Sequence, residues 1–154
     1  MKQLITLVCM MCLVFAGCSG SQSGNDELSL KIEGSQADAW INVMPGSRTT
    51  FFVTGSLSIR NYGDSTVNSI KIMKCLVSQG KDIIYDLIPD LKDSLGSLMS
   101  VESGQLKIGL FSSKGVELKN EFNTDKPVDL LIYLVSSKMT KQVFIPGVKI
   151  TKVH

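Results

Sequence analysis

The sequence has few of the side chains that most often perform catalysis near neutral pH. Histidine occurs once, as the final residue His154, where chains usually fray. Three of the four cysteines lie within the first 18 residues, so Cys75 stands alone in the rest of the chain. These counts leave no zinc-ligand cluster, no HExxH motif and no Cys–His pair in an ordered position.

Neither sign of charge dominates the chain. Sixteen Lys and Arg residues stand against 14 Asp and Glu residues. Such a balance produces no strong field that would attract nucleic acid or the face of an anionic bilayer. We therefore expect no nucleic-acid partner.

The first 17 residues have the tripartite form of an export signal. Lys2 is a basic tip, an apolar run extends from Leu4 to Ala16, and the run ends in small residues. A helix that spans a bilayer needs about 20 apolar residues, so this run is too short. A retained membrane helix is the alternative, but it would leave Cys18 unexplained.

The segment Leu13-Val-Phe-Ala-Gly-Cys18 resembles the lipobox of bacterial lipoproteins, with Phe15 where Leu is usual. The resemblance implies cleavage before Cys18 and lipidation of its thiol, so that acyl chains hold the protein on a membrane of the cell envelope. Because Ser19 rather than Asp follows the cysteine, the resemblance also implies that the protein is sorted to the outer membrane if the source has two membranes. The membrane is then a partner through lipid alone.

Removal of the first 17 of 154 residues leaves 137, enough for one domain with one core. Residues 19–27 contain no apolar side chain and have the composition of a flexible tether of roughly 15–18 Å. We expect a single domain over residues 28–154. No intramolecular disulfide can form there, and Cys75 should be buried as a small hydrophobe rather than serve as a reactive thiol.

From Leu28 onward, apolar residues mostly recur with a period of two, which predicts strands. The expected strands are residues 28–32, 39–43, 51–60, 67–78, 83–88, 106–110, 116–119, 128–135 and 142–153, the last interrupted at Pro146. Residues 51–60 send odd positions inward. Residues 128–135 are apolar at both parities, which indicates a strand covered on both faces or ending beneath a loop.

Three local features refine this pattern. Asn61 to Ser65 has turn chemistry, and Gln79-Gly-Lys81 has that of a hairpin tip. The change of parity between Ile72 and Cys75 predicts a bulge near Met73 and Lys74. After about residue 88, the apolar spacing favours one or two helical turns, although Pro89 would break a continuous helix.

Short strands joined by Gly-rich turns predict an all-β fold, namely an immunoglobulin-like antiparallel β-sandwich of about eight strands. Residues 55–63, Val67, Ile70 and residues 78–83 resemble the core of FxLYD-type immunoglobulin-like modules of prokaryotic envelope proteins. The likeness spans residues 50–135, and residues 74–78 replace the namesake aromatic-Leu-Tyr-Asp stretch. The resemblance implies a β-sandwich without catalytic residues.

Two sets of side chains are candidates for chemistry, and each has a plainer interpretation. Ser78 and Lys81 match the S-x-x-K spacing, which needs a helix but here falls on a hairpin. Four aspartates recur at intervals that could gather calcium, but they also suit a solvated face with turn caps. They are Asp82, Asp86, Asp90 and Asp93. Trp40 is either a core residue, which we favour, or an exposed anchor for a ligand.

We therefore expect a non-enzymatic lipoprotein whose sandwich is a binding or structural module, with no cofactor and no metal. Its partners besides the membrane would be envelope proteins. One alternative is a small hydrolase or metal enzyme using Ser78 and Lys81, or the aspartates from Asp82 to Asp93. The other is a carrier of an apolar ligand between its sheets, which would require a large enclosed apolar cavity.

Overall fold

A computed structural model describes residues 30–46, 48–136 and 139–154 of the chain. The expected signal peptide, the lipidated Cys18 and the tether lie outside these residues.

The described residues form eleven strands and no helix. The strands are β1 (Leu30–Asn42), β2 (Thr50–Asn61), β3 (Val67–Gln79), β4 (Asp82–Leu87), β5 (Asp90–Asp93), β6 (Met99–Val101), β7 (Leu106–Ser112), β8 (Val116–Glu117), β9 (Val128–Val135), β10 (Thr140–Val148) and β11 (Ile150–Val153). The all-β prediction is confirmed. The expected number of about eight was too low because β5, β6, β8 and β11 have only two to four residues each.

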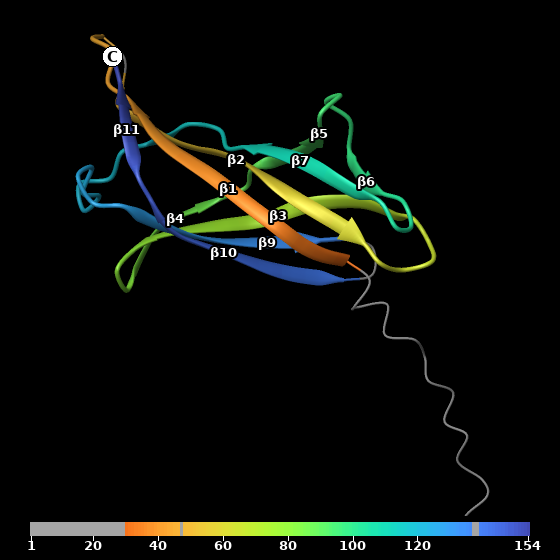
Figure 1. The fold of residues 1–154 in the computed structure, drawn as a ribbon. Coiled ribbons are helices and arrows are strands. Elements are labelled where there is room, and N and C mark those ends of the chain that lie inside the picture. The colour runs from red at the N-terminus through yellow and green to blue at the C-terminus, as the bar shows by residue number, and fades with distance from the viewer. Residues whose placement is uncertain (1–29, 47, 137–138) are drawn as a thin grey trace, which may run out of the picture.

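The strands make two sheets that pack face to face (Figure 1). The first sheet has the order β11-β1-β2-β7-β5, with β8 also on β2, and the second has the order β10-β9-β3-β4, with β6 also on β3. This is the strand order of an immunoglobulin-like sandwich, in which strands A, B, E and D form one sheet and G, F and C lie in the other. All pairs are antiparallel except β1 with β11, which is parallel.

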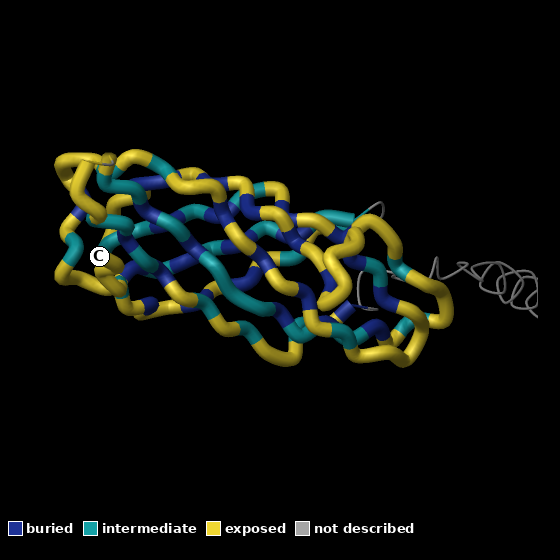
Figure 2. Tube along the Cα trace, turned by 90° about the horizontal axis from the view of Figure 1, so that it is seen from above, coloured by how far each residue is buried: buried dark blue, intermediate teal, exposed yellow. Residues whose placement is uncertain are grey.

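Alternating side chains of β2 and β9 supply the centre of the core. Figure 2 shows the resulting alternation of buried and more exposed positions along the strands. On β2 the odd positions face inward as predicted, and Phe51, Val53, Leu57 and Ile59 are completely buried. On β9, Val128, Leu130, Ile132 and Leu134 face them, while the other parity is half-buried. The outer face of β9 is therefore left partly open to solvent.

The predicted bulge lies where the change of parity placed it. The pairing of β3 with β9 shifts between Ile72 and Lys74. Met73 and Lys74 therefore both point away from the core, while Ile72 and Cys75 on either side of them are buried. The bulge lets β3 keep an apolar inner face along its whole length.

The prediction of one or two helical turns after about residue 88 is wrong, because the chain crosses from one sheet to the other there. β4 ends at Leu87 in the second sheet, and β5 begins at Asp90 in the first. Proline has no backbone N–H that could donate a hydrogen bond to a neighbouring strand. Buried Pro89 therefore suits the unpaired step between the two sheets. The helix-like spacing has no common buried face, since Leu91 is buried while Leu95 and Leu98 are exposed.

Two other expectations need correction. The runs 28–32 and 39–43 were expected as separate strands, but residues 30–42 form one strand with a bulge between Ile32 and Gly34. Trp40 is not a core residue, because its neighbours Ala39 and Ile41 take the inward parity. Its ring stacks on Phe52 at the outer face of the first sheet, with ring centroids 4.0 Å apart.

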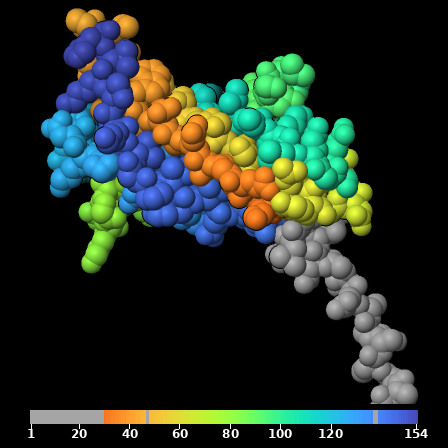
Figure 3. Space-filling model, viewed as in Figure 1, coloured from red at the N-terminus to blue at the C-terminus, as the bar shows by residue number. Residues whose placement is uncertain are grey.

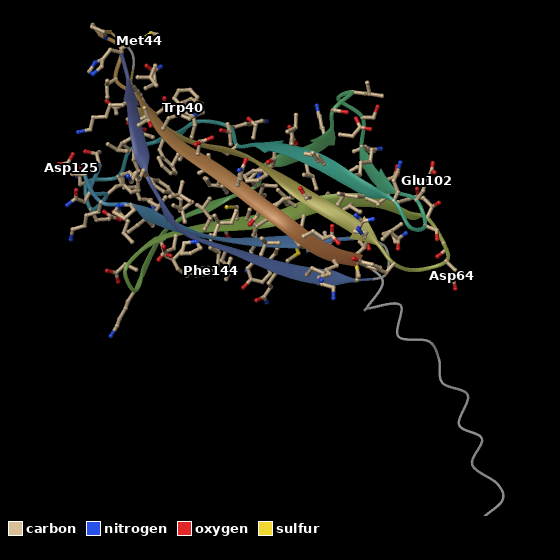
Figure 4. The ribbon with its side chains drawn as sticks, viewed as in Figure 1. Trp40, Met44, Asp64, Glu102, Asp125 and Phe144 are labelled. Carbon is tan, nitrogen blue, oxygen red and sulfur yellow. The ribbon has the colours of Figure 1, made fainter. Side chains whose placement is uncertain are left out.

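The sandwich is elongated, and its two ends differ. At the proximal end, where β1 begins, lie Asp64 and Glu102 (Figure 4). At the distal end lie Met44 and Asp125 (Figure 4). The C-terminus, in dark blue, lies at the same end (Figures 1 and 3). The rings of Phe51, Tyr85 and Phe122 close the core near the loop that leads into β9, with neighbouring centroids 4.9–5.4 Å apart.

Candidate binding surface

The predicted Ser–Lys pair does not share a helical face. Ser78 lies in β3, where its hydroxyl donates to the backbone carbonyl of Asp129 at 3.5 Å. Lys81 is exposed in the turn after Gly80, whose φ is 66°. The turn prediction is confirmed, and the S-x-x-K spacing spans a strand end and a hairpin tip.

The four aspartates are divided between the two sheets. Asp82 and Asp86 belong to β4 in the second sheet, and Asp90 and Asp93 belong to β5 in the first. Within residues 30–46, 48–136 and 139–154, no three His, Cys, Asp or Glu side chains come close enough to hold a metal ion.

Asp93 is the buried member of this set, and its contacts stabilise a turn. Its Oδ1 accepts hydrogen bonds from the amides of Ser97, at 2.9 Å, and Leu95, at 3.0 Å. Its Oδ2 lies 3.1 Å from the ammonium of Lys107. The Ser97 bond, followed by Lys107 and Leu95, holds the pKa of Asp93 below its ordinary value even though burial acts in the opposite direction.

Cys75 is completely buried, as predicted. Burial, with a smaller contribution from the charge of Asp86, raises the pKa of its thiol to about 12. A thiol with this pKa is a poor nucleophile near neutral pH. His154 is exposed after β11.

A row of apolar side chains crosses the outer face of the second sheet. Leu76, Leu131 and Phe144 are direct cross-strand neighbours on β3, β9 and β10, and Asp86 on β4 ends the row. Phe144 has 60% of its surface exposed, and Leu76 and Leu131 are half-buried. In Figure 4, Phe144 lies on the opposite side of the sandwich from Trp40. We call this set the Phe144 row.

The next row toward the proximal end, which we call the Lys74 row, contains Lys74, Tyr133 and Gln142. The Lys74 ammonium lies 4.5 Å from the centroid of the Tyr133 ring, a cation–π distance. The bulge turns Met73 outward beside them, 47% exposed. The apolar surface therefore continues beyond the Phe144 row.

Charges of opposite sign flank this apolar centre. Lys71 and Lys74 lie on the proximal side, where Lys71 is paired with Val135. Asp86 lies in the Phe144 row itself, and Asp129 lies one row further toward the distal end, opposite Ser78. The Asp129 carboxylate accepts a hydrogen bond from the amide of Gly147 at 2.8 Å, which fixes its position. We call the Phe144 row, the Lys74 row and these charges the outer face of the second sheet.

The first sheet has an apolar stripe of its own on β7. Leu106, Ile108 and Leu110 are 44%, 54% and 50% exposed, although alternation alone would equally allow them to face the core. Gly109 and Phe111 face the core instead. The neighbours of this stripe on β2 are Arg60, Ser58 and Ser56.

A groove at the distal end and a pocket at the proximal end differ in size and in the residues that line them. An open groove of about 670 Å³ at the distal end is lined by Lys126, Lys149 and Lys152, and Lys152 pairs with Asp125 at 3.0 Å. The apolar pocket at the proximal end of the core, near Leu30, has a volume of about 10 Å³. That is about the minimum for one water molecule, so this pocket does not provide the cavity that a carrier of apolar ligands needs.

Sequence reasoning did not identify Phe144. It named Asp86 only as a candidate calcium ligand or solvated residue, and Lys74 only as part of a bulge. The available signal was the strand at residues 128–135, whose two apolar parities imply that something besides the core contacts its outer face.

No family model matches the chain, and no curated protein is significantly similar to it. Among the residues that the structure describes, no helix is both long and apolar enough to cross a membrane.

Proposed function

We propose that this chain is a lipoprotein of the cell envelope, anchored through Cys18, whose β-sandwich is a non-enzymatic binding module. In this proposal, the signal-like residues 1–17 and the small residues before Cys18 direct processing, and residues 19–27 are the tether. Acyl chains on Cys18 would supply stable membrane residence at about 0.8 kcal/mol per buried CH₂ group.

The observation that carries the binding role is the exposure of the Phe144 row. Phe144 is 60% exposed and adjoins half-buried Leu131 and Leu76, so the three side chains form a contiguous apolar patch rather than a singly exposed residue. Contiguous apolar patches mark interaction sites more often than single exposed residues do. Aromatic residues, phenylalanine included, are enriched in protein–protein interfaces relative to the rest of the surface. The face is therefore the best candidate for contact with another envelope protein.

The anchor is tested by mass spectrometry of the mature N-terminal peptide. We expect a peptide that begins at Cys18 and carries acyl chains, and we expect Cys18→Ser to leave the precursor uncleaved and unacylated. Cys12→Ser is the matched control, because Cys12 lies in the segment that is removed, and it should process normally. An unmodified Cys18 in the mature wild-type protein would refute the anchor.

The binding role is tested separately, by crosslinking in membranes followed by identification of the products. Phe144→Asp should remove crosslinked products of the wild-type chain, whereas Ile108→Asp on the other sheet should retain them. Ile108 is a suitable control because it is 54% exposed, close to the value for Phe144. Identical products from both variants would exclude the outer face of the second sheet as the binding surface.

A further inference from the structure

We infer that the outer face of the second sheet binds a second copy of this chain, as an antiparallel two-fold dimer. The inference rests on the proposed binding role of this face and names its partner.

The apolar part of the face has the composition of an interface centre. Phe144 and Met73 are 60% and 47% exposed, and Leu76, Leu131 and Tyr133 are half-buried between them. Interface centres are enriched in aromatic residues and methionine and depleted of charge, with polar groups at the rim. Here the charged groups lie around the apolar centre.

The charges on this face are complementary to those of an identical face turned end to end. Lys74 and Lys71 lie toward the proximal end, whereas Asp129 lies toward the distal end. A two-fold axis in the interface plane, running across the strands between the Phe144 row and the Lys74 row, exchanges the two ends. A patch that is self-complementary in this way is what a two-fold interface requires.

The register of the strands specifies the resulting pairs. Leu131 of one copy is placed over Tyr133 of the other. Asp86 then lies one strand spacing, about 4.8 Å in projection, from Lys74 of the second copy. Asp129 lies at the same spacing from Lys71. Each pair occurs twice, so four ion pairs surround the apolar centre.

A parallel arrangement is disfavoured by the same charges. An axis that runs along the strands would place the proximal ends together, and Lys71 and Lys74 of both copies would share one end of the interface. Like charges facing each other across an interface are costly and suppress the wrong arrangement. The face therefore specifies an antiparallel dimer.

The stripe on β7 of the first sheet has no comparable arrangement. Its nearest charged neighbours are Lys92, which pairs with Leu110, and Arg60, which pairs with Leu106. The Arg60 guanidinium is already bound to Glu33 at 3.0 Å. The acidic neighbour on this face, Asp90 of β5, is opposite Ser112 and only one row from Lys92. The stripe therefore does not separate its acidic and basic groups toward opposite ends, as the outer face of the second sheet does.

The antiparallel dimer is compatible with two anchors in one membrane. The two copies of β1, each 13 residues and roughly 43 Å long, would start at opposite ends of the dimer. If the two-fold axis is parallel to the membrane normal, both starts lie at the same height. Residues 19–29 span at most roughly 40 Å when extended, which is enough to reach the bilayer from either end.

The test is the oligomeric state of the full-length protein purified in detergent, measured by sedimentation velocity over a range of concentrations. We expect a monomer–dimer equilibrium in the wild type. Phe144→Asp should raise the dimer Kd by about 30-fold or more, as expected for a central aromatic residue. Ile108→Asp should leave Kd unchanged, and circular dichroism should show that both variants are folded.

A charge exchange tests the antiparallel pairing. Lys74→Glu and Asp86→Lys should each raise Kd by roughly tenfold, because each places like charges together in the dimer. The double variant restores opposite charges and should return Kd to within about threefold of the wild type. Double variants that remain as weak as the single ones would refute the antiparallel arrangement.

The outcome is independent of the anchor. A Cys18→Ser protein that is not acylated should still dimerise, so loss of lipid and loss of self-association are distinguishable. A wild-type protein that is acylated but monomeric at the highest concentration overturns the inference and leaves the anchor intact. A different protein crosslinked to the wild type but not to Phe144→Asp, with a monomeric chain, assigns the face to that partner and also overturns the inference.

Discussion

The buried side-chain amide of Asn61 donates a hydrogen bond to the backbone carbonyl of Val101, 3.1 Å away, and so ties the end of β2 to β6 on the opposite sheet. The same amide donates to the carbonyl of Ser65 at 2.7 Å, and the Asn61 side-chain oxygen accepts from the amide of Gly63 at 2.9 Å. One side chain thus holds the turn after β2 and joins it to the second sheet.

Asn61→Ala should lower the free energy of unfolding by about 2–4 kcal/mol, because three hydrogen bonds disappear and buried backbone groups lose their partners. Urea denaturation at neutral pH measures the effect. Asn120→Ala is the control, because Asn120 is exposed, and its effect should stay within about 0.5 kcal/mol. Equal effects of the two variants would contradict the joining role of Asn61.

Gly55→Ala should also destabilise the fold, but through steric overlap of the added methyl group with neighbouring atoms. Gly55 occupies a core-facing position of β2, and an added Cβ would collide with the backbone oxygen of Gln36 and the ring of Phe111. Overpacking of this kind costs about 1–3 kcal/mol.

Gly34→Ala is the matched control for Gly55. An added Cβ at Gly34 would make ordinary contact with Ser58 Oγ at 3.6 Å. Its thermal unfolding midpoint should remain unchanged or rise slightly. A similar loss in both variants would show that strand glycines matter here for a reason other than space.

Much of the fold followed from alternation, because a period of two marks a strand wherever one face meets the core. The pattern predicted β2 with its inward parity, the bulge of β3 and the hairpin at Gly80. It failed after β4, where apolar residues at helical spacing lie on a chain that changes sheets at Pro89. The step depends on the position of the opposite sheet, which no local pattern encodes.

The candidate surface was less predictable for the same physical reason. Alternation identifies two faces of a strand but not which of them is buried. On β7 the apolar parity of Ile108 faces solvent, because Gly109 allows Leu91 and Met99 to approach on the inner side. The Phe144 row becomes visible only when the register of β3, β9 and β10 is known.

The stability of the protein should depend on pH in the acid range through Asp93. Hydrogen bonding, first from Ser97, lowers the pKa of Asp93 in the folded state relative to the unfolded chain. The stabilisation is therefore present above the ordinary pKa of about 4 and is lost as the pH falls through the lower folded value.

Asp93→Asn should be less stable than the wild type above about pH 5, and the difference should shrink as the pH falls below about 4. Guanidinium denaturation at a series of pH values measures it. Lys107→Met should retain part of the pH dependence, because the Ser97 amide is the largest cause of the shift. A constant difference between Asp93→Asn and the wild type at all pH values would contradict this assignment.

Cys75 should react with iodoacetamide only when the protein unfolds. Its side chain is completely buried, and burial raises the pKa of the thiol to about 12. At pH 8 a thiol with that pKa is ionised in only about one molecule in ten thousand, and the reagent cannot reach it in the native state.

Alkylation of the peptide that contains Cys75, measured by mass spectrometry, should be negligible over an hour without denaturant. It should be complete within minutes in concentrated guanidinium. Because the peptide is measured separately, Cys9, Cys12 and Cys18 do not interfere. Rapid alkylation of the native protein would mean that the second sheet opens near β3, and it would revive the reactive thiol as an alternative to a packing role.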